Sequence, residues 1–342
     1  MKAITRQDVA KLAEVSVSAV SRVMNKNGYV AKEKREAILK AVKELGYRPS
    51  PVAVAMQKRE TRQLLFQHRD LGNTFTTDIY RGMVHASIEQ GYMVMLSGSV
   101  DLSHIKTMMV DGVILWNEGV AVEYNKTMNN VLSIPTVSAS YGSSVLRPKG
   151  IPFVESDSHA AMELAIDYLF SCGHEKIALA TPYPISMGNP RSTAYKSKLL
   201  PVFGSDIDKY TFVCSHSKSC PTEEENFYAD GEEIAQYIVD SRSDATAVAC
   251  FNDDIAIGLL NRFHRIGVKV PEDISVIGID GLELGEYIYP RLTSVNLHPY
   301  EQGMECAKVL IGMLNGKKIK GRTNIPITLV ERESVCKINR ST

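Results

Sequence analysis

Residues 4–25 constrain this chain more than any other segment, because they predict two short amphipathic helices separated by a tight turn. Thr5 and Asp8 stand three residues apart at the start of the first helix, which is the spacing of a capping box. Ser16 is placed to cap the second helix, whose valines are spaced to pack against the first. This arrangement is a helix-turn-helix, a motif that places its second helix in the major groove of DNA.

Packing of the second helix against the first leaves one face directed outward. Arg22 on that face matches the two major-groove acceptors of guanine, because its guanidinium is a planar fork. The side chains beside it are small and offer apolar or hydroxyl contacts. The predicted DNA contacts of this motif are Thr5, Ser16, Val17, Ser18, Ala19, Ser21, Arg22 and Asn25. The alternative is a surface helix of an ordinary helical domain.

A third helix is predicted over residues 32–45, so that residues 1–49 form a three-helix headpiece. Residues 50–60 follow, where a serine cap and a proline predict a short hinge helix and a linker. The predicted contacts of this helix with the DNA minor groove are Val52, Ala53 and Met56, with the methionine as an apolar wedge. The alternative is that the segment serves only as a linker.

The charges are divided unevenly along the chain. The whole sequence holds 39 basic and 39 acidic residues, but residues 1–62 hold 14 basic residues against 6 acidic ones. The remainder therefore carries the compensating negative charge. This distribution is typical of a protein with one module that binds a polyanion and another that does not.

After the hinge, short apolar runs alternate with segments of helical period, which predicts parallel sheets covered by helices on both faces. The expected strands lie at 92–96, 112–115, 134–137, 176–180, 210–214, 247–251 and 275–279, and the expected helices at 78–90, 158–172, 226–239, 254–266 and 299–314. Because 342 residues are too many for one such core, two α/β subdomains are expected in residues 61–342. Their expected ranges are about 61–155 with 284–315, and about 156–283 with 316–342.

Ligands of open parallel sheets bind at the carboxyl ends of the strands. Polar residues that follow predicted strands are therefore candidate ligand contacts: Asp157, Arg191, Asn252, Asp253 and Asp280. Carboxylates accept hydrogen bonds from sugar hydroxyls, and a guanidinium and an amide donate to them, so this set suits a sugar. Helix capping is the alternative role for Asp157, Asn252 and Asp253.

The chain resembles the lactose/galactose repressor family over its full length. The residues that carry the resemblance occur in the family's order: Asp8-Val9-Ala10, Val15-Ser16, Val20-Ser21-Arg22-Val23, Asn25, Leu45-Gly46-Tyr47-Arg48-Pro49, Val110-Asp111-Gly112-Val113-Ile114, Gly173-His174, Phe251-Asn252-Asp253 and Asp273-Ile274-Ser275-Val276-Ile277-Gly278.

That resemblance implies a periplasmic-binding-protein-like body. By it, Arg22 reads the operator, Met56 occupies the position of a leucine that opens the central base step, and Arg191 and Asp280 contact the ligand. Phe75 is similarly implied as a wall of the cleft between the subdomains.

The chain departs from the family pattern at three places. Glu14 stands where the family prefers glycine in the turn between the first two helices, and a left-handed conformation there costs about 1 kcal/mol. Ala31 lacks the capping hydroxyl that usually precedes the third helix. The run 96–111 is shorter than in the family, which removes a length of helix from the first subdomain.

The sequence shows few features of an enzyme, a metalloprotein or a membrane protein. The sequence has no Walker loop, no nucleophile elbow and no Gly-x-Gly-x-x-Gly, so neither an enzyme nor a cofactor is expected. Six cysteines without Cys-x-x-Cys spacing and scattered histidines predict no metal site, and the run 223–225 of three glutamates predicts a solvated loop or a helix start. No leader and no long apolar stretch occurs, so we expect a cytoplasmic protein that does not bind membranes.

These patterns predict a repressor of sugar-utilisation genes that binds a pseudo-palindromic DNA operator as a homodimer. A small sugar in the cleft between the subdomains would control allosterically whether the two hinge helices can meet. One alternative is a nucleobase or a phosphorylated metabolite as corepressor, although Phe75 and Phe227 are the only aromatic residues expected near the cleft. Another is a sugar-binding or sugar-processing protein with an incidental DNA domain.

Overall fold

The fold was obtained as a computed structural model that describes residues 4–68, 72, 74–142, 147–215 and 226–338. The chain divides into two compact units, Met1–Thr61 and Arg62–Thr342. Cys220 and the acidic run 223–225 lie outside the described residues.

The first unit contains the three predicted helices, α1 (Arg6–Leu12), α2 (Val17–Met24) and α3 (Lys32–Leu45). The capping box at α1 is confirmed, because the Thr5 backbone N–H donates to Asp8 Oδ2 at 2.7 Å. In return, the backbone N–H of Asp8 donates to Thr5 Oγ1 at 3.4 Å. These two bonds satisfy amide groups that the first turn of α1 leaves free.

The core of the headpiece consists of apolar side chains from all three helices, with Val9, Val20 and Ile38 fully buried. Glu14 has a left-handed backbone with a φ of 50°, as its place in the turn implies. Ala31 gives α3 no side-chain cap, so this helix starts without the hydrogen bond that a serine would supply.

A fourth helix, α4 (Pro51–Lys58), occupies the predicted hinge. Ser50 caps it, because its Oγ accepts from the backbone N–H of Ala53 at 3.4 Å. The side chains of Val52, Ala53 and Met56 are exposed, and Met56 retains 73% of its accessible surface. The helix therefore presents an apolar surface that the rest of its unit does not cover.

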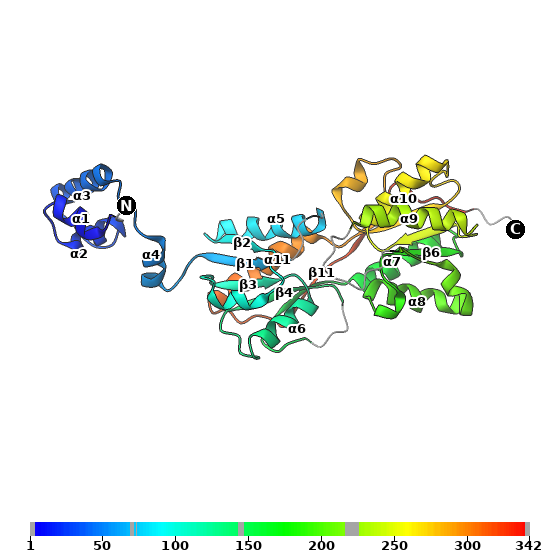
Figure 1. Cartoon of the computed structure of the whole chain (residues 1–342), viewed down its shortest axis with the longest axis horizontal. Helices are drawn as coiled ribbons and strands as arrows, with labels where there is room; N and C mark the ends of the chain where they lie inside the picture. The colour runs from blue at the N-terminus through cyan, green and yellow to red at the C-terminus, as the bar shows by residue number, and fades with distance from the viewer. Residues whose placement is uncertain (1–3, 69–71, 73, 143–146, 216–225, 339–342) are drawn as a thin grey trace. The chain divides into compact units, whose positions relative to one another are not determined.

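The second unit is built on two six-stranded sheets (Figure 1). The first has the order β11-β5-β4-β3-β1-β2, and its neighbouring strands all run parallel. Its strands are β1 (Gln63–Gln67), β2 (Met93–Ser97), β3 (Gly112–Leu115), β4 (Thr136–Ser140), β5 (Phe153–Ser156) and β11 (Arg322–Ile325). The run 96–111 contains one short 3-10 helix, η1 (Leu102–Thr107), which buries Leu102 and Ile105.

The second sheet has the order β12-β10-β9-β8-β6-β7, and β12 is its antiparallel strand. Its strands are β6 (Ile177–Thr181), β7 (Thr211–Val213), β8 (Ala247–Cys250), β9 (Ser275–Asp280), β10 (Thr293–Asn296) and β12 (Thr328–Val330). The helices of the body are α5 (Thr74–Glu89), α6 (Glu118–Thr127), α7 (Ser158–Ser171), α8 (Pro190–Phe203), α9 (Phe227–Asp240), α10 (Asp253–Ile266) and α11 (Pro299–Leu314).

Two strands overturn the expected subdomain ranges. β10 pairs with β9 in the second sheet, although residues 284–315 were expected in the first subdomain. β11 pairs with β5 in the first sheet, although residues 316–342 were expected in the second. The chain therefore passes from one sheet to the other three times, after β5, after β10 and between β11 and β12.

Glycines bring two pairs of helices into backbone contact. A Cβ atom on Gly82 of α5 would overlap the carbonyl oxygen of Tyr300, and one on Gly303 of α11 would overlap that of Ile79. Likewise, a Cβ atom on Gly231 of α9 or on Gly258 of α10 would overlap a backbone carbonyl oxygen of the facing helix. The pairs α5 with α11 and α9 with α10 therefore form tightly packed layers beside the two sheets (Figure 1).

Candidate DNA interface and ligand site

The outward face of α2 is formed in part as predicted, because Ala19 and Ser21 are half-buried and Ala19 packs against the headpiece core. Val20 and Val23 are buried against the other helices, whereas Val17, Ser18, Arg22 and Asn25 are exposed. The same face therefore carries an apolar, a hydroxyl, an amide and a guanidinium group, the chemistry that reads base edges.

Hydrogen bonds order part of this face before any DNA is bound. The Oγ of Ser21 accepts from Arg6 Nη1 at 3.3 Å and from Asn25 Nδ2 at 3.4 Å. Ser16 accepts from the backbone N–H of Ala19 at 3.2 Å, which caps α2. Thr5, Ser16 and Ser21 thus have roles inside the headpiece, and their DNA contacts remain predictions.

The predicted DNA contacts omit Tyr29, an exposed aromatic residue of the headpiece. Tyr29 retains 87% of its accessible surface in the turn between α2 and α3. The preceding residue, Gly28, has a φ of 83°, and a Cβ atom there would lie 3.5 Å from Arg22 Cδ. A glycine followed by an aromatic residue between two helices was the signal that could have identified this position.

In the body, the structure brings together Arg191 and Asp280, which lie 89 positions apart in the sequence. Arg191 stands at the start of α8 and Asp280 at the end of β9. Arg191 Nη2 donates to Asp280 Oδ1 at 2.7 Å, and Nη1 donates to the carbonyl oxygen of Phe251. The guanidinium carbon also lies 5.0 Å from the centre of the Phe251 ring. This pair is only 8% and 6% exposed, so a ligand can reach it only if the surrounding groups move apart.

Burial is the main cause of the shifted pKa values of Asp280 and Asp253. It raises the pKa of Asp280 to about 7, even though Arg191 acts to lower it. Burial likewise raises the pKa of Asp253 to about 6, and hydrogen bonds from Ser294 and Leu282 oppose the shift.

The raised pKa of Asp280 predicts a pH dependence of stability. Its ordinary pKa is 3.8, so the folded protein holds this proton more tightly than the unfolded chain. The resulting stabilisation is fully present below about pH 4 and is lost as the pH rises through about 7. We expect Asp280→Asn to flatten this part of the profile, measured by the urea midpoint at about pH 5 and about pH 8. Identical slopes for parent and variant would contradict the assignment.

Both carboxylate oxygens of Asp253 accept hydrogen bonds from other residues of the chain. Its Oδ1 accepts from Ser294 Oγ at 2.6 Å, and its Oδ2 accepts from the backbone N–H of Leu282 at 2.7 Å. The side chain is fully buried, and a Cβ atom on Gly278 would overlap it. The carboxylate therefore joins α10 to the turn after β9 and to β10. Its contact with a ligand remains a prediction.

Three other predicted residues have structural roles. Asn252 caps α10, because its Oδ1 accepts from the backbone N–H of Ile255 at 2.9 Å. Asp157 caps α7 through the backbone N–H groups of two residues, at 3.0 and 3.1 Å. Phe75 is 7% exposed and belongs to the core. The ligand contacts of all three remain predictions. For Asn252 and Asp157, the cap oxygen can accept a second bond.

Aromatic rings gather at the carboxyl ends of both sheets, so the expectation that only Phe75 and Phe227 lie there is wrong. On the first sheet, Trp116 lies between His68 and Tyr141, with ring centres 4.2 and 5.2 Å apart. On the second, Phe251 lies 5.5 Å from Tyr183 and 6.5 Å from Phe227. Sequence periodicity could not identify these groups, because their members follow different strands.

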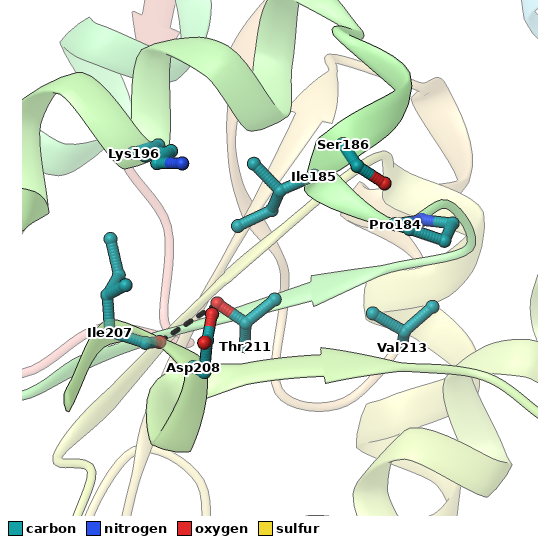
Figure 2. Close-up of a pocket in the computed structure, with 8 residues that line it drawn as sticks. All are labelled: Pro184, Ile185, Ser186, Lys196, Ile207, Asp208, Thr211 and Val213. Carbon is teal, nitrogen blue, oxygen red and sulfur yellow. Dashed lines mark hydrogen bonds between the residues drawn. The ribbon is translucent and has the colours of Figure 1, made fainter. Parts of the chain in front are cut away.

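Two surface pockets lie away from these residues. Figure 2 shows one of about 390 Å³ next to β7, where Thr211 Oγ1 donates to the carbonyl oxygen of Ile207 at 3.0 Å. Its lining residues are Pro184, Ile185, Ser186, Lys196, Ile207, Asp208, Thr211 and Val213. Another, of about 440 Å³, lies beside residues 150–152 and 316–321. Neither is lined by a predicted ligand residue.

The described residues contain no helix long and apolar enough to cross a membrane. Within the same ranges, no three His, Cys, Asp or Glu side chains are grouped to hold a metal ion. The five described cysteines are free thiols.

The chain has a helix-turn-helix headpiece, a short hinge helix and a body of two sheets, with a buried ion pair at the carboxyl end of the second sheet. These features define a DNA-binding regulator with a ligand-binding body. Residues 5–50 match the model of bacterial regulatory proteins of the lacI family, and residues 166–335 match a periplasmic binding protein-like domain. The chain belongs to the lacI family and is a DNA-binding transcriptional regulator.

Relatives align along nearly the whole chain. The HTH-type transcriptional repressor PurR of Vibrio atlanticus is 30% identical over 98% of this chain and 99% of its own. The ribose operon repressor of Halalkalibacterium halodurans is 29% identical over 96% of each chain. A solved lacI-family regulator from Enterococcus faecium with bound ribose is 25% identical, with a TM-score of 0.68 over 81% of this chain and 100% of its own. Both relatives are named as repressors.

Proposed function

We propose that this chain represses sugar-utilisation genes and that a small sugar, bound where the carboxyl ends of the two sheets meet, controls its hold on the operator. The observation that carries the proposal is the buried Arg191–Asp280 pair. A homodimer would bind a pseudo-palindromic operator through two headpieces and two hinge helices. It would act in the cytoplasm and leave the sugar chemically unchanged.

The chemistry of the pair suits sugar hydroxyls. Asp280 can accept from two hydroxyls. Arg191 has five N–H groups, of which the bonds to Phe251 and Asp280 use two, so it can also donate to a ring or hydroxyl oxygen. The ribose bound by the Enterococcus faecium regulator supports this class of ligand. A ligand that binds only one arrangement of the two sheets shifts the population toward that arrangement.

A nucleobase acting as corepressor is the second candidate. The rings of Trp116 and Tyr141 on one sheet and of Phe251 on the other favour it, because a planar base stacks on aromatic faces. The sign of the ligand effect on DNA binding separates the two candidates.

The test uses the full chain. A DNA site is first selected from a random pool, and binding to that site is then measured with and without D-ribose, other free sugars and nucleobases. We expect a pseudo-palindromic site and at least tenfold weaker binding with one sugar, about 1.4 kcal/mol. Tighter binding with a nucleobase would favour the second candidate. Equal binding to all sequences would refute the proposal.

A further inference from the structure

Two loops at one edge of the first sheet carry a cluster of lysines. Residues 147–152 lead into β5 and residues 315–321 lead into β11, and these two strands are neighbours in the sheet. The loops lie side by side where they join the strands, because the backbone N–H of Phe153 donates to the carbonyl oxygen of Gly321 at 3.0 Å. The lysines of the two loops are here called the lysine patch: Lys149, Lys317, Lys318 and Lys320.

The positive charge of the lysine patch is not balanced by the protein around it. All four side chains are exposed, and none forms an ion pair with a described residue. The loops that lead into the other strands from β2 on carry one carboxylate, Asp111, which accepts from the backbone N–H of Arg62 at 2.8 Å. Residues 63–342 as a whole hold 25 basic residues against 33 acidic ones, so the patch is a local exception in an acidic body.

Stabilisation of a helix end explains only part of the patch. Lys317 lies three residues after the end of α11, where a cation interacts favourably with the helix dipole. Lys149 and Lys320 instead precede strands, so this effect gives no reason for their charge. Like charges that are close in the sequence repel one another, and an anion with several charges removes that repulsion. The patch is therefore suited to a multivalent anion.

The shape of the surface favours an extended anion over a compact one. The two loops line the pocket of about 440 Å³ described above, but most of its walls are apolar or glycine residues. Lys317 is its one charged lining residue, and the other three lysines of the patch lie outside the lining. A small anion is bound by several donors that converge on it. Cations spread around a pocket, by contrast, match charges spaced along a polymer.

The chain enters the body at the same edge of the first sheet. The strands from β1 across to β11 are all parallel, so their amino ends lie along one edge. β1 begins at Gln63, five residues after Lys58, which ends the hinge helix α4. Five residues span at most about 17 Å. β5 lies three strands from β1, which is about 14 Å at the usual spacing. One turn of DNA is about 34 Å long, so a duplex bound by the hinge helix is long enough to reach the patch.

We propose that the lysine patch contacts the phosphate backbone of DNA that flanks the operator, outside the base pairs that the headpieces read. Such contacts carry no sequence information, so they add affinity and salt dependence without changing the sequence that is recognised. The inference goes beyond the proposed function, because it gives the ligand-binding body a direct contact with DNA. It needs no ligand.

The first test measures what flanking DNA adds to the affinity of the full chain. Binding is measured on the selected site alone and on the same site with about one and a half turns of flanking duplex on each side, over a range of salt concentrations. We expect the parent to bind the long duplex at least tenfold more tightly at low salt. A variant with all four patch lysines replaced should bind both duplexes equally, and its salt slope on the long duplex should be smaller by about 2–4. The replacements are Lys149→Gln, Lys317→Gln, Lys318→Gln and Lys320→Gln.

A matched control removes the same charge from the half of the body that is built on the second sheet. Its replaced lysines are also exposed, and we expect it to keep the parent's preference for the long duplex. If the patch variant keeps that preference, or if the control loses it equally, the patch makes no specific contact with DNA. A parent that binds both duplexes equally would also overturn the inference. The control replacements are Lys196→Gln, Lys209→Gln, Lys269→Gln and Lys337→Gln.

The second test locates the contact on the DNA. Hydroxyl-radical footprints of the long duplex should show protected sugars in the flanks with the parent and with the control, and only within the site with the patch variant. Both variants should keep the parent's Tm, because the replaced side chains are exposed. Flanks that stay protected in the patch variant would contradict the inference.

Inorganic pyrophosphate serves as a compact anion in the same preparations. If it raises the Tm of the parent but not of the patch variant, and if flanking DNA adds no affinity, the patch is a small-anion site and the DNA contact is overturned. No sugar is present in these measurements. Loss of the flank preference therefore leaves the proposed control by a sugar standing, and a missing sugar response leaves the DNA contact standing.

Discussion

Replacement of Asp280 by alanine is expected to abolish the response of DNA binding to the ligand while leaving the affinity for the operator unchanged. The carboxylate is 6% exposed and bonded to a guanidinium that is 8% exposed. Its loss removes an acceptor for the ligand and leaves Arg191 buried without its partner, which destabilises a protein by about 3–5 kcal/mol. Operator binding is measured with and without the ligand, and stability by urea unfolding.

Two further variants separate the ligand response from stability. The double variant Arg191→Met with Asp280→Leu should recover most of the stability, since apolar residues can replace a buried ion pair, but should remain unresponsive. Asp244→Ala removes an exposed carboxylate that pairs with Lys176, just before the strands β8 and β6, and should respond as the parent does. An Asp280→Ala protein that is folded and still responds would show that the ligand binds elsewhere.

Arg22→Ala is expected to weaken binding to the selected DNA site far more than binding to random DNA. Arg22 is exposed on the outward face of α2, and a guanidinium bonded to guanine contributes about 1–3 kcal/mol of discrimination. A dimer loses this contact in both half-sites. The measurement is the ratio of the two dissociation constants at one salt concentration.

Lys26→Gln is the matched control for Arg22→Ala. Lys26 is also exposed, in the turn after α2, and a lysine that contacts only phosphate affects all sequences equally. This variant should reduce both affinities by the same factor and lower the salt slope by about 1. If Arg22→Ala behaves in the same way, Arg22 contacts phosphate and not a base.

Sequence patterns predicted the helices whose buried residues recur at regular spacing along the chain. The helix expected at 158–172 is α7 (Ser158–Ser171), and the one expected at 299–314 matches α11. Both bury several residues at helical spacing against a sheet, which is the signal that periodicity detects. The hinge and the headpiece were predicted in the same way, from caps, proline and apolar spacing.

Pairing between distant strands was not predictable from such patterns. β11 has the sequence Arg-Thr-Asn-Ile and lies at an edge, where alternate residues are exposed and no apolar run forms. β11 lies beside β5 because the chain returns to the first sheet at this point. The spacing of apolar residues gives no information about such a return. The expected subdomain ranges were wrong for this reason.

The candidate ligand site was predicted in part. Arg191 and Asp280 were implied by family resemblance, and the structure shows them bonded to each other. Asp253 carries the same type of side chain, but only its contacts with Ser294 and Leu282 reveal that both oxygens are used. The aromatic groups around Trp116 and Phe251 were missed because their members follow different strands, which no residue spacing records.

The three crossings between the sheets have a consequence for how the protein is made. β11 and β12 come last in the chain, and each is an edge strand, one in each sheet. Neither half of the body is a continuous stretch of sequence, so a ribosome cannot release a finished first half before it starts the second. A chain that ends after α11 would lack one strand of both sheets at once. The two halves are therefore completed together, by the same short stretch of chain.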